Sequence, residues 1–295
     1  MNPSRIRGRP EIAAGANAGE AFIANVRAAL AQIDANAAGA AGERDPEYLH
    51  QVRVGLRRLR STLRAFRSLL RKREAAAFDQ MLRDVLRALG GARDWDIFRR
   101  SNCDENLVRA AQRNGAAARR RARGVLRSAR FKTALRRVLA WAKAAPWRSR
   151  ADPDEPVAAF ARRALRRLQD RLCEDADGVD WRDAAQRHRV RVKVKRLRYG
   201  CECFAAAYQK RKVRPYLKRL RKLQQVLGEM NDITVQRMLL QELARDAPLR
   251  RPVAALRRTL AARERVLTGE AVQAWNGFES TKPFWRRAAA VRARG

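Results

Sequence analysis

The sequence predicts an all-α protein built from two related helical units. Apolar residues recur at spacings of three and four along most of the chain, which is the period of an amphipathic helix. No stretch alternates apolar and polar residues for long, so strands are not expected. The register of residues 20–94 recurs without a gap 138 positions later, since 188 − 50 = 138 for the two histidines. The chain has 295 residues, 46% of them apolar, which suffices for one large domain or two of about 150 residues.

The first elements are marked by turn and capping residues. Residues 1–15 hold two prolines and two glycines, which predicts a flexible arm. Residues 17–37 predict a first helix, because Phe, Val, Leu and Ile recur there at helical spacing. Asp45 and Pro46 form a helix start, and a second helix is expected to run from there to about residue 71. A third helix is predicted over residues 74–89, ended by glycines, and a fourth is predicted with Asp94 as its cap.

The middle and the end of the chain are also predicted to be helical. Residues 106–151 contain no acid and 14 basic residues, which indicates helices with an exposed cationic surface. Trp141 and Trp147 are expected to serve in packing, and Pro146 to Pro156 is expected to be a linker. After the second unit comes a helix over about residues 253–270. Three aromatic residues should then dock the C-terminal tail, namely Phe278, Phe284 and Trp285.

One stretch of eleven residues occurs twice and carries both histidines of the chain. Residues 50–60 read HQVRVGLRRLR and residues 188–198 read HRVRVKVKRLR, so 7 of the 11 aligned positions are identical. At about 100° per residue, the first copy places a row of cations beside an apolar stripe. That row is expected to continue from His50 to Arg71, over roughly 30 Å. The second row is shorter, because Glu202 stands where the first has Arg64, and Arg58 and Arg196 point away from the rows.

The first row contains no acid. Like charges three or four residues apart on a helix repel each other by roughly 0.2–0.5 kcal/mol per pair. A surface shaped for stability alone would mix both signs, so the row indicates that an anion arrives from outside. The alternative is an ordinary charged face in contact with solvent.

The composition indicates which kinds of partner and which compartment to expect. Lys+Arg 67 against Asp+Glu 30 gives a net charge of +37, and ten of the cations are lysines, so 67 − 10 = 57 are arginines. Arginine offers a planar fork that matches pairs of phosphate oxygens. The four cysteines show no CxxC spacing and are expected to be reduced residues of a core. We see neither a secretory signal nor an apolar run that could span a membrane, so an intracellular, cytoplasmic protein is expected.

Both copies, together with Leu89-Gly90-x-x-Arg93-Asp94 and Leu227-Gly228-x-x-Asn231-Asp232, resemble the CHAD domain (conserved histidine α-helical domain). The resemblance extends over about residues 16–290, with repeats at about 16–150 and 154–290. It implies two pseudo-symmetric antiparallel bundles of about four helices each around a basic central groove or pore. It also implies binding of inorganic polyphosphate and association with polyphosphate granules. The Glu-x-Glu-x-Lys motif of the triphosphate-tunnel domain that accompanies some members is not found, which is typical of a stand-alone domain.

The predicted polyphosphate-binding site combines the two rows with cations of the third helix of each half. Both histidines are expected to donate hydrogen bonds to phosphate, or else to be structural. The predicted residues are His50, Arg53, Arg57, Arg58, Arg60, Arg64, Arg83, Arg87, His188, Arg191, Lys195, Arg196, Arg198, Lys218, Arg221 and Lys222.

Two other functions remain open. A nucleic-acid-binding protein would have similar electrostatics, but single-strand binders interleave aromatic residues with the basic groove, and the His50 row has none. An enzyme of phosphoryl transfer would need clustered carboxylates for Mg²⁺, whereas Asp94, Asp96 and Asp232 are interpreted as helix caps. We therefore expect no catalytic residue, metal or cofactor. Other phosphate or sulfate anions are further candidate partners.

Overall fold

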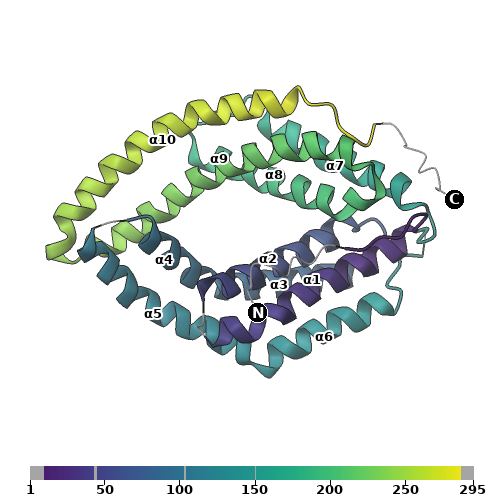
Figure 1. Cartoon of the computed structure of the whole chain (residues 1–295), viewed down its shortest axis with the longest axis horizontal. Helices are drawn as coiled ribbons and strands as arrows, with labels where there is room; N and C mark the ends of the chain where they lie inside the picture. Colours follow the sequence, from purple (N-terminus) through teal and green to yellow (C-terminus); the bar gives the residue numbers. More distant parts are fainter. Residues whose placement is uncertain (1–9, 43–44, 103, 150, 287–295) are drawn as a thin grey trace.

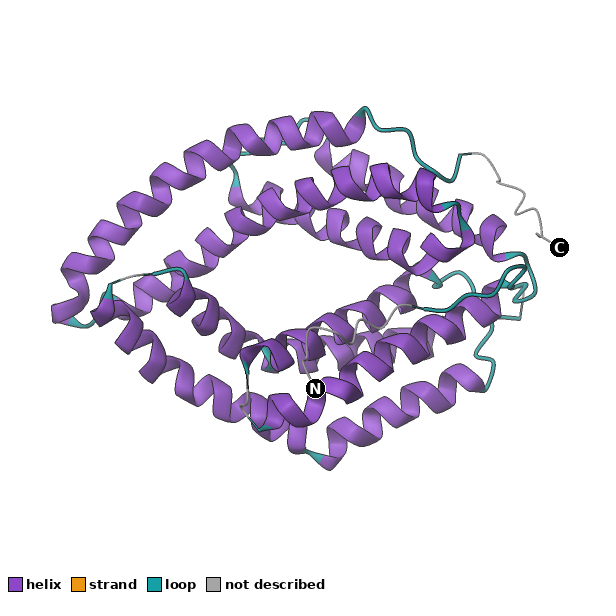
Figure 2. Cartoon of the chain, in the orientation of Figure 1, coloured by secondary structure: helices purple, strands orange, loops and turns teal. Residues whose placement is uncertain are grey.

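The computed structural model describes residues 10–42, 45–102, 104–149 and 151–286. Over these ranges all regular structure is helical apart from two isolated β-bridges, which confirms the all-α prediction (Figure 2). Within the described residues no helix is long and apolar enough to cross a membrane. Cys201 and Cys203 are buried and not in disulfides, while Cys103 lies outside the described residues, as does most of the predicted N-terminal arm.

The first half contains α1 (Ala18–Ala41), α2 (Pro46–Ala65), α3 (Lys72–Ala88) and α4 (Gly90–Arg100). The prediction that the second helix reaches residue 71 is wrong. The backbone N–H of Arg71 donates to the carbonyl of Pro146, and that of Arg148 donates to the carbonyl of Leu69. These bonds to a distant loop replace the next helical turn, so α2 ends at Ala65.

The prediction that Asp94 caps a helix is also wrong. Gly90 begins α4 directly after the end of α3, so Asp94 and Asp96 lie inside α4. At the equivalent position of the second half the helix is not interrupted, because α9 (Lys210–Leu243) runs through Gly228 and Asp232. A glycine inside a helix costs only about 1 kcal/mol. The buried Leu227 and Met230 hold the helix together across that position.

The remaining helices are α5 (Glu105–Arg127), α6 (Ala129–Lys143), α7 (Val157–Ala176), α8 (Ala184–Phe204) and α10 (Arg250–Glu279), with short 3₁₀ turns η2 (Ala205–Ala207) and η3 (Ala247–Leu249). Shifted by 138 residues, α1 and α2 overlay α7 and α8. The α9 helix covers the positions of α3 and α4 together, and α10 lies within those of α5 and α6. The described part of the first half therefore has six α-helices and the second has four, rather than about four each. The two-repeat division and its pseudo-symmetry stay predictions.

The helices form a flattened ring (Figure 1). The α2, α4, α8 and α9 helices line its inside, while α5, α6 and α10 lie along the outside. The inner position of α2 depends on its close approach to α1. A Cβ at Gly55 would lie only 2.6 Å from Cγ1 of Ile33 and 3.1 Å from the carbonyl oxygen of Ala29. Glycine at this point lets the two helices touch, which turns the cationic edge of α2 away from α1.

An aromatic cluster joins the two halves where α2 and α8 end. The fully buried Phe66 stacks on Phe160 with 5.3 Å between ring centroids and contacts Phe204 at 4.9 Å. Phe22 packs on Phe66 from the α1 side and also meets both predicted tryptophan anchors, Trp141 and Trp147. This cluster belongs to one continuous core that extends through both halves.

Contacts in the structure bear on two predicted segments, the linker over residues 146–156 and the aromatic C-terminal tail. The linker over residues 146–156 is not a free tether, because its carbonyls at Pro153 and Glu155 accept the N–H groups of Gly19 and Ala18, each at 2.9 Å. The C-terminal aromatic residues do dock, as predicted, since Phe284 and Trp285 pack against the buried ring of Tyr216.

Candidate anion-binding site

Two helices present the predicted cation rows, and their sequences explain why. A carboxylate caps each one: Asp45 accepts the N–H of Glu47 at 2.7 Å, and Asp183 accepts that of Ala185 at 2.7 Å. Both caps were predicted. The apolar stripe of each helix is buried, namely Val52, Leu56, Leu59 and Leu63 on α2, and Val190, Val194, Leu197 and Cys201 on α8. The rows beside these stripes are left half-buried, apart from the exposed His188.

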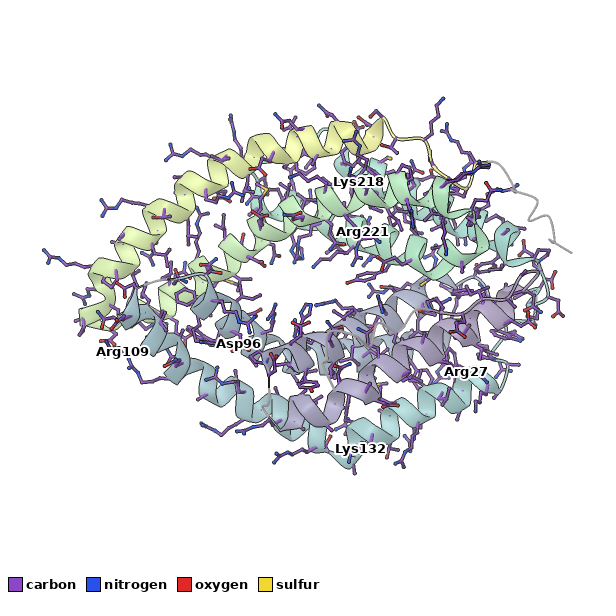
Figure 3. All side chains as sticks on the ribbon, viewed as in Figure 1. Arg27, Asp96, Arg109, Lys132, Lys218 and Arg221 are labelled. Carbon is purple, nitrogen blue, oxygen red and sulfur yellow. The ribbon has the colours of Figure 1, made fainter. Side chains whose placement is uncertain are left out.

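The two rows come close to each other where residues 50–57 of α2 lie near residues 191–195 of α8. Burial is the main cause that lowers the pKa of Arg191 and Lys195 on α8, and the charge of Arg57 on α2 lowers both further. Arg93 of α4 joins them, because it lowers the pKa of His50. Figure 3 shows nitrogen-tipped side chains reaching from both sides into the space between these helices. We call this group the central cluster: His50, Arg53, Arg57, Arg93, Arg191 and Lys195.

The cations of the central cluster have few partners. Arg57, Arg93, Arg191 and Lys195 make no hydrogen bond or ion pair with any described residue, and Arg53 only donates to the carbonyl of Leu86 at 3.1 Å. Four buried guanidinium nitrogens lack an acceptor among the described residues: Nε of Arg53, Arg57 and Arg191, and Nη1 of Arg93. Buried donors without acceptors are costly, which indicates that an external anion completes them.

Burial and mutual repulsion shift the pKa values in this cluster. Burial, followed by the charge of Arg93, lowers the pKa of His50 to about 4. Burial, followed by the charges of Arg191 and Arg57, lowers the pKa of Lys195 to about 7. Burial also lowers the pKa of Arg53 to about 10. An anion bound here would favour the charged forms and raise all three pKa values again.

Two carboxylates lie beside the central cluster, and the sequence interpretation missed their role. Asp94 and Asp232, interpreted as caps, come from inside α4 and α9. Burial raises the pKa of both carboxyl groups. The charge of Arg53 acts to lower the pKa of Asp94, and the charge of Arg191 acts to lower that of Asp232. Arg93 was quoted in the motif but not predicted as a site residue. It neighbours both carboxylates, and its signal was its place beside Asp94 in the repeated Leu-Gly-x-x-x-Asp pattern.

The outer part of the α2 row is paired with an acid of another helix, although the row itself contains none, as predicted. Asp79 of α3 accepts from Arg60 and Arg64 at 2.9 Å each, and from Arg83 at 3.4 Å. Burial acts to raise the pKa of Asp79, but the hydrogen bonds from Arg60 and Arg64 outweigh it and hold the pKa below its usual value. The acid comes from another helix, so the pattern along α2 alone does not reveal it.

The outer part of the α8 row is also paired with an acid. Glu202 pairs with Arg198 at 2.5 Å and lies 3.7 Å from Arg221 of α9. Arg58 faces the same side, where it donates to Gln32 at 2.5 Å. These residues line a pocket of about 910 Å³ between the two halves, with Tyr199 and Tyr208 in its wall.

The other predicted residues are scattered. His188, Lys218, Lys222 and Arg87 are exposed, and Arg87 pairs with Asp84 at 3.2 Å. Figure 3 places Lys218 and Arg221 on α9, far from Arg109 and Lys132 at the outer rim. Arg196 is half-buried, and burial followed by the charge of Arg64 lowers its pKa. The structure therefore gathers the α2 and α8 rows and leaves most of the predicted α3 and α9 cations at the edge.

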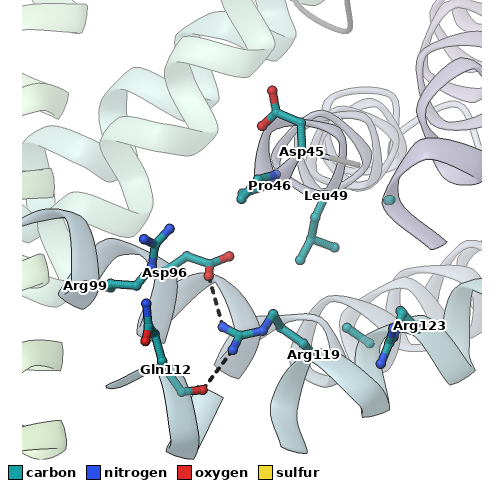
Figure 4. A pocket seen from close by; sticks show the side chains of 10 residues that line it. Asp45, Pro46, Leu49, Asp96, Arg99, Gln112, Arg119 and Arg123 are labelled. Atoms are coloured by element: carbon teal, nitrogen blue, oxygen red, sulfur yellow. Dashed lines mark hydrogen bonds and ion pairs between the residues drawn. The ribbon is translucent and has the colours of Figure 1, made fainter. Parts of the chain in front are cut away.

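A second hollow, of about 440 Å³, lies between the start of α2, α4 and α5 (Figure 4). There the buried Asp96 meets Arg119 at 3.4 Å, and Arg119 also donates to the carbonyl of Gln112 at 2.8 Å. Because Arg119 and Asp96 are already paired, we interpret them as a structural contact and not as an anion site. Among the described residues no three His, Cys, Asp or Glu side chains converge as metal ligands would.

Comparisons with known proteins agree with this architecture. The model of the CHAD domain family matches residues 24–241. The crystal structure of the CHAD domain from the plant Ricinus communis is similar, with a TM-score of 0.82 and 31% identity over 94% of this chain and 96% of that chain. PptA from Streptomyces chartreusis shares the fold, with a TM-score of 0.64 and 18% identity over 92% and 100% of the two chains. No curated protein matches this chain.

Proposed function

This chain belongs to the CHAD domain family, since the family's model matches residues 24–241, and from that premise we propose that it binds inorganic polyphosphate through the central cluster. The role is that of a non-catalytic module that associates with polyphosphate granules in the cytoplasm. Polyphosphate is a linear polyanion without bases. Its recognition requires donors of positive charge in a line and no stacking surface.

One observation carries the proposal. Cations from both halves face one space, and their buried nitrogens lack acceptors among the described residues. Keeping Arg57, Arg191 and Lys195 together is unfavourable for the free protein. Burial, followed by the charge of Arg57, lowers the pKa of Arg191, and burial, followed by the charges of Arg191 and Arg57, lowers that of Lys195. A polyanion reverses that cost by supplying charge-assisted hydrogen bonds, which are about twice as strong as neutral ones.

Nucleic acid is the second candidate, and the side-chain arrangement disfavours it. Single-strand binders offer exposed aromatic rings on which bases stack. Here Tyr199 is the nearest ring on the α8 row, and it is buried, with the guanidinium of Arg198 4.2 Å from its centroid. A catalytic role is also disfavoured, because Asp94 and Asp232 lie against cations rather than beside a third acid that would complete a Mg²⁺ site.

A competition experiment tests the proposal. Long-chain polyphosphate, single-stranded RNA and duplex DNA are compared at equal charge concentration over a salt titration. Polyphosphate should compete best at every salt concentration. The double variant Arg57→Gln with Arg191→Gln should lose about a hundredfold in affinity, because two charge-assisted contacts are removed.

The matched control removes two charges elsewhere. Arg120 and Arg121 are exposed on α5, so Arg120→Gln with Arg121→Gln should change the affinity less than about twofold. Equal losses in both double variants would mean that the net charge, and not the central cluster, binds the polymer. Stronger competition by RNA or DNA would favour the nucleic-acid alternative.

A further inference from the structure

Four arginines outside the central cluster form another cationic group at the end of α2. Arg64 and Arg67 from α2 and its C-terminal turn, with Arg167 and Arg171 from α7, surround a small hollow. The guanidinium of Arg167 donates a hydrogen bond to Oγ of Ser68 at 3.2 Å. The side chains of Arg67 and Arg171 make no hydrogen bond or ion pair with a described residue, although the backbone carbonyl of Arg171 accepts from Lys193. We call Arg67, Arg167 and Arg171 the exit arginines.

The nearby acids do not relieve this charge, because other cations occupy them. Asp170 lies 4.0 Å from Arg166, and Asp175 pairs with Lys193 at 2.8 Å. Burial, followed by the charge of Arg171, lowers the pKa of Arg67. The hollow between these side chains, about 10 Å³, is too small for a phosphate, so an anion would lie over the arginines rather than between them. Like charges held together in this way indicate a site for an anion, as they do in the central cluster.

The exit arginines are continuous with the central cluster. Arg196 of α8 is near both groups, because after burial the charges of Arg64, Arg60 and Arg171 all lower its pKa, while Asp79 acts against them. Between them, the pairing around Asp79 leaves a net charge of 3 − 1 = +2, since three arginines share one carboxylate. Cations thus follow one another from Arg53 to Arg171, along α2 and across to α7.

The internal repeat shows that this extension exists on one side only. Shifted by 138 residues, Arg64 corresponds to Glu202 and Arg67 to Ala205, while Arg167 corresponds to Ala29 and Arg171 to Ile33. Glu202 draws in Arg198 and Arg221, and Ala29 and Ala205 line the pocket of about 910 Å³. Where the first side continues with arginines, the second side has a carboxylate and small apolar residues.

We propose that the anion path leaves the central cluster in one direction only, over the exit arginines, so that long polyphosphate chains gain contacts that short ones cannot reach. This inference rests on the proposed function and adds to it a direction and a preference for chain length. At about 1.5 Å per residue, the α2 row from His50 to Arg64 is roughly 21 Å long. A ligand as short as tripolyphosphate occupies the central cluster and ends before Arg67.

The test compares two ligands and two variants. The triple variant Arg67→Gln, Arg167→Gln, Arg171→Gln is measured by calorimetry with tripolyphosphate and with long-chain polyphosphate at one salt concentration. Its control, Arg113→Gln, Arg120→Gln, Arg121→Gln, removes the same charge from exposed positions of α5. We expect the exit variant to weaken long-chain binding about tenfold or more and tripolyphosphate binding less than about twofold, with the control within about twofold for both.

The outcomes separate the two proposals. A triple variant that weakens both ligands equally, or neither, overturns the directional path while the proposed function stands. If the unmodified protein binds neither ligand, the proposed function fails and the path fails with it. Thermal unfolding of the free variants verifies that they are folded, which is expected because Arg67 and Arg171 are exposed.

Discussion

Lys195 is the residue whose charge depends most on the ligand. Its neighbours and its burial lower its pKa to about 7, so in the free protein it loses its proton near neutral pH. A bound phosphate raises that pKa, because the anion favours the ammonium. Below pH 7 binding needs no proton uptake, whereas above pH 7 the complex must take one up. Affinity should therefore fall as the pH rises from 6 to 8, by at most about tenfold per pH unit.

The variant Lys195→Arg isolates this effect. Arginine keeps its proton throughout this range, so the affinity for polyphosphate should become nearly independent of pH between 6 and 8. Burial, followed by the charge of Arg93, lowers the pKa of His50 to about 4, so in the free protein this ring carries no charge between pH 6 and 8. An unchanged pH profile in the arginine variant would show that another group takes up the proton.

At the scale of the element, α3 controls how much of the α2 row is available. Asp79 holds Arg60 and Arg64, so Asp79→Asn should free two guanidinium groups for the ligand. We expect polyphosphate affinity to rise about threefold to tenfold and the free energy of unfolding to fall by about 1–3 kcal/mol, because a partly buried pair loses its anion. Titration calorimetry and urea unfolding measure the two effects. Weaker binding in this variant would mean that Asp79 positions the arginines rather than competing with the ligand.

The contact between α2 and α8 depends on an aromatic side chain. Phe66 is fully buried against Phe22, Phe160 and Phe204, which come from both halves. Phe66→Ala should lower the free energy of unfolding by about 3–5 kcal/mol, since the cavity it leaves cannot be filled by one helix alone. The half-buried Phe78 is the control, and its change to Ala should cost less. Urea unfolding gives both values, and equal losses would argue against a special role for the junction.

At the scale of the whole molecule, the net charge of +37 opposes folding and favours binding. Salt screens both effects, with a Debye length of about 10 Å at 0.1 M. Raising the salt concentration should therefore raise the melting temperature of the free protein while it lowers the affinity for polyphosphate. Differential scanning fluorimetry with and without the polymer measures both in one series. A melting temperature that falls with salt in the free protein would show that its charges are already compensated.

Much of the fold can be predicted from neighbours along the chain. The period of the apolar residues gives the helices, and Asp45 and Asp183 mark where α2 and α8 begin. The helix breaks were less predictable. Gly90 begins a new helix whereas Gly228 lies inside one, because the difference depends on packing with residues far away in the sequence. The presence of Arg57, Arg191 and Lys195 in rows was also visible, since a row needs only a helical spacing.

What only the tertiary structure decided is which charges remain uncompensated. Asp79 and Glu202 each pair with outer arginines, while Asp94 and Asp232 reach the central cluster from inside helices. The exit arginines are assembled from the turn after α2 and from α7. Sequence alone determined that this chain forms cationic helices in two related sets. The packing of helices determined where those cations meet an acid and where they meet only one another, because an ion pair depends on distances across the fold rather than on spacing along a helix.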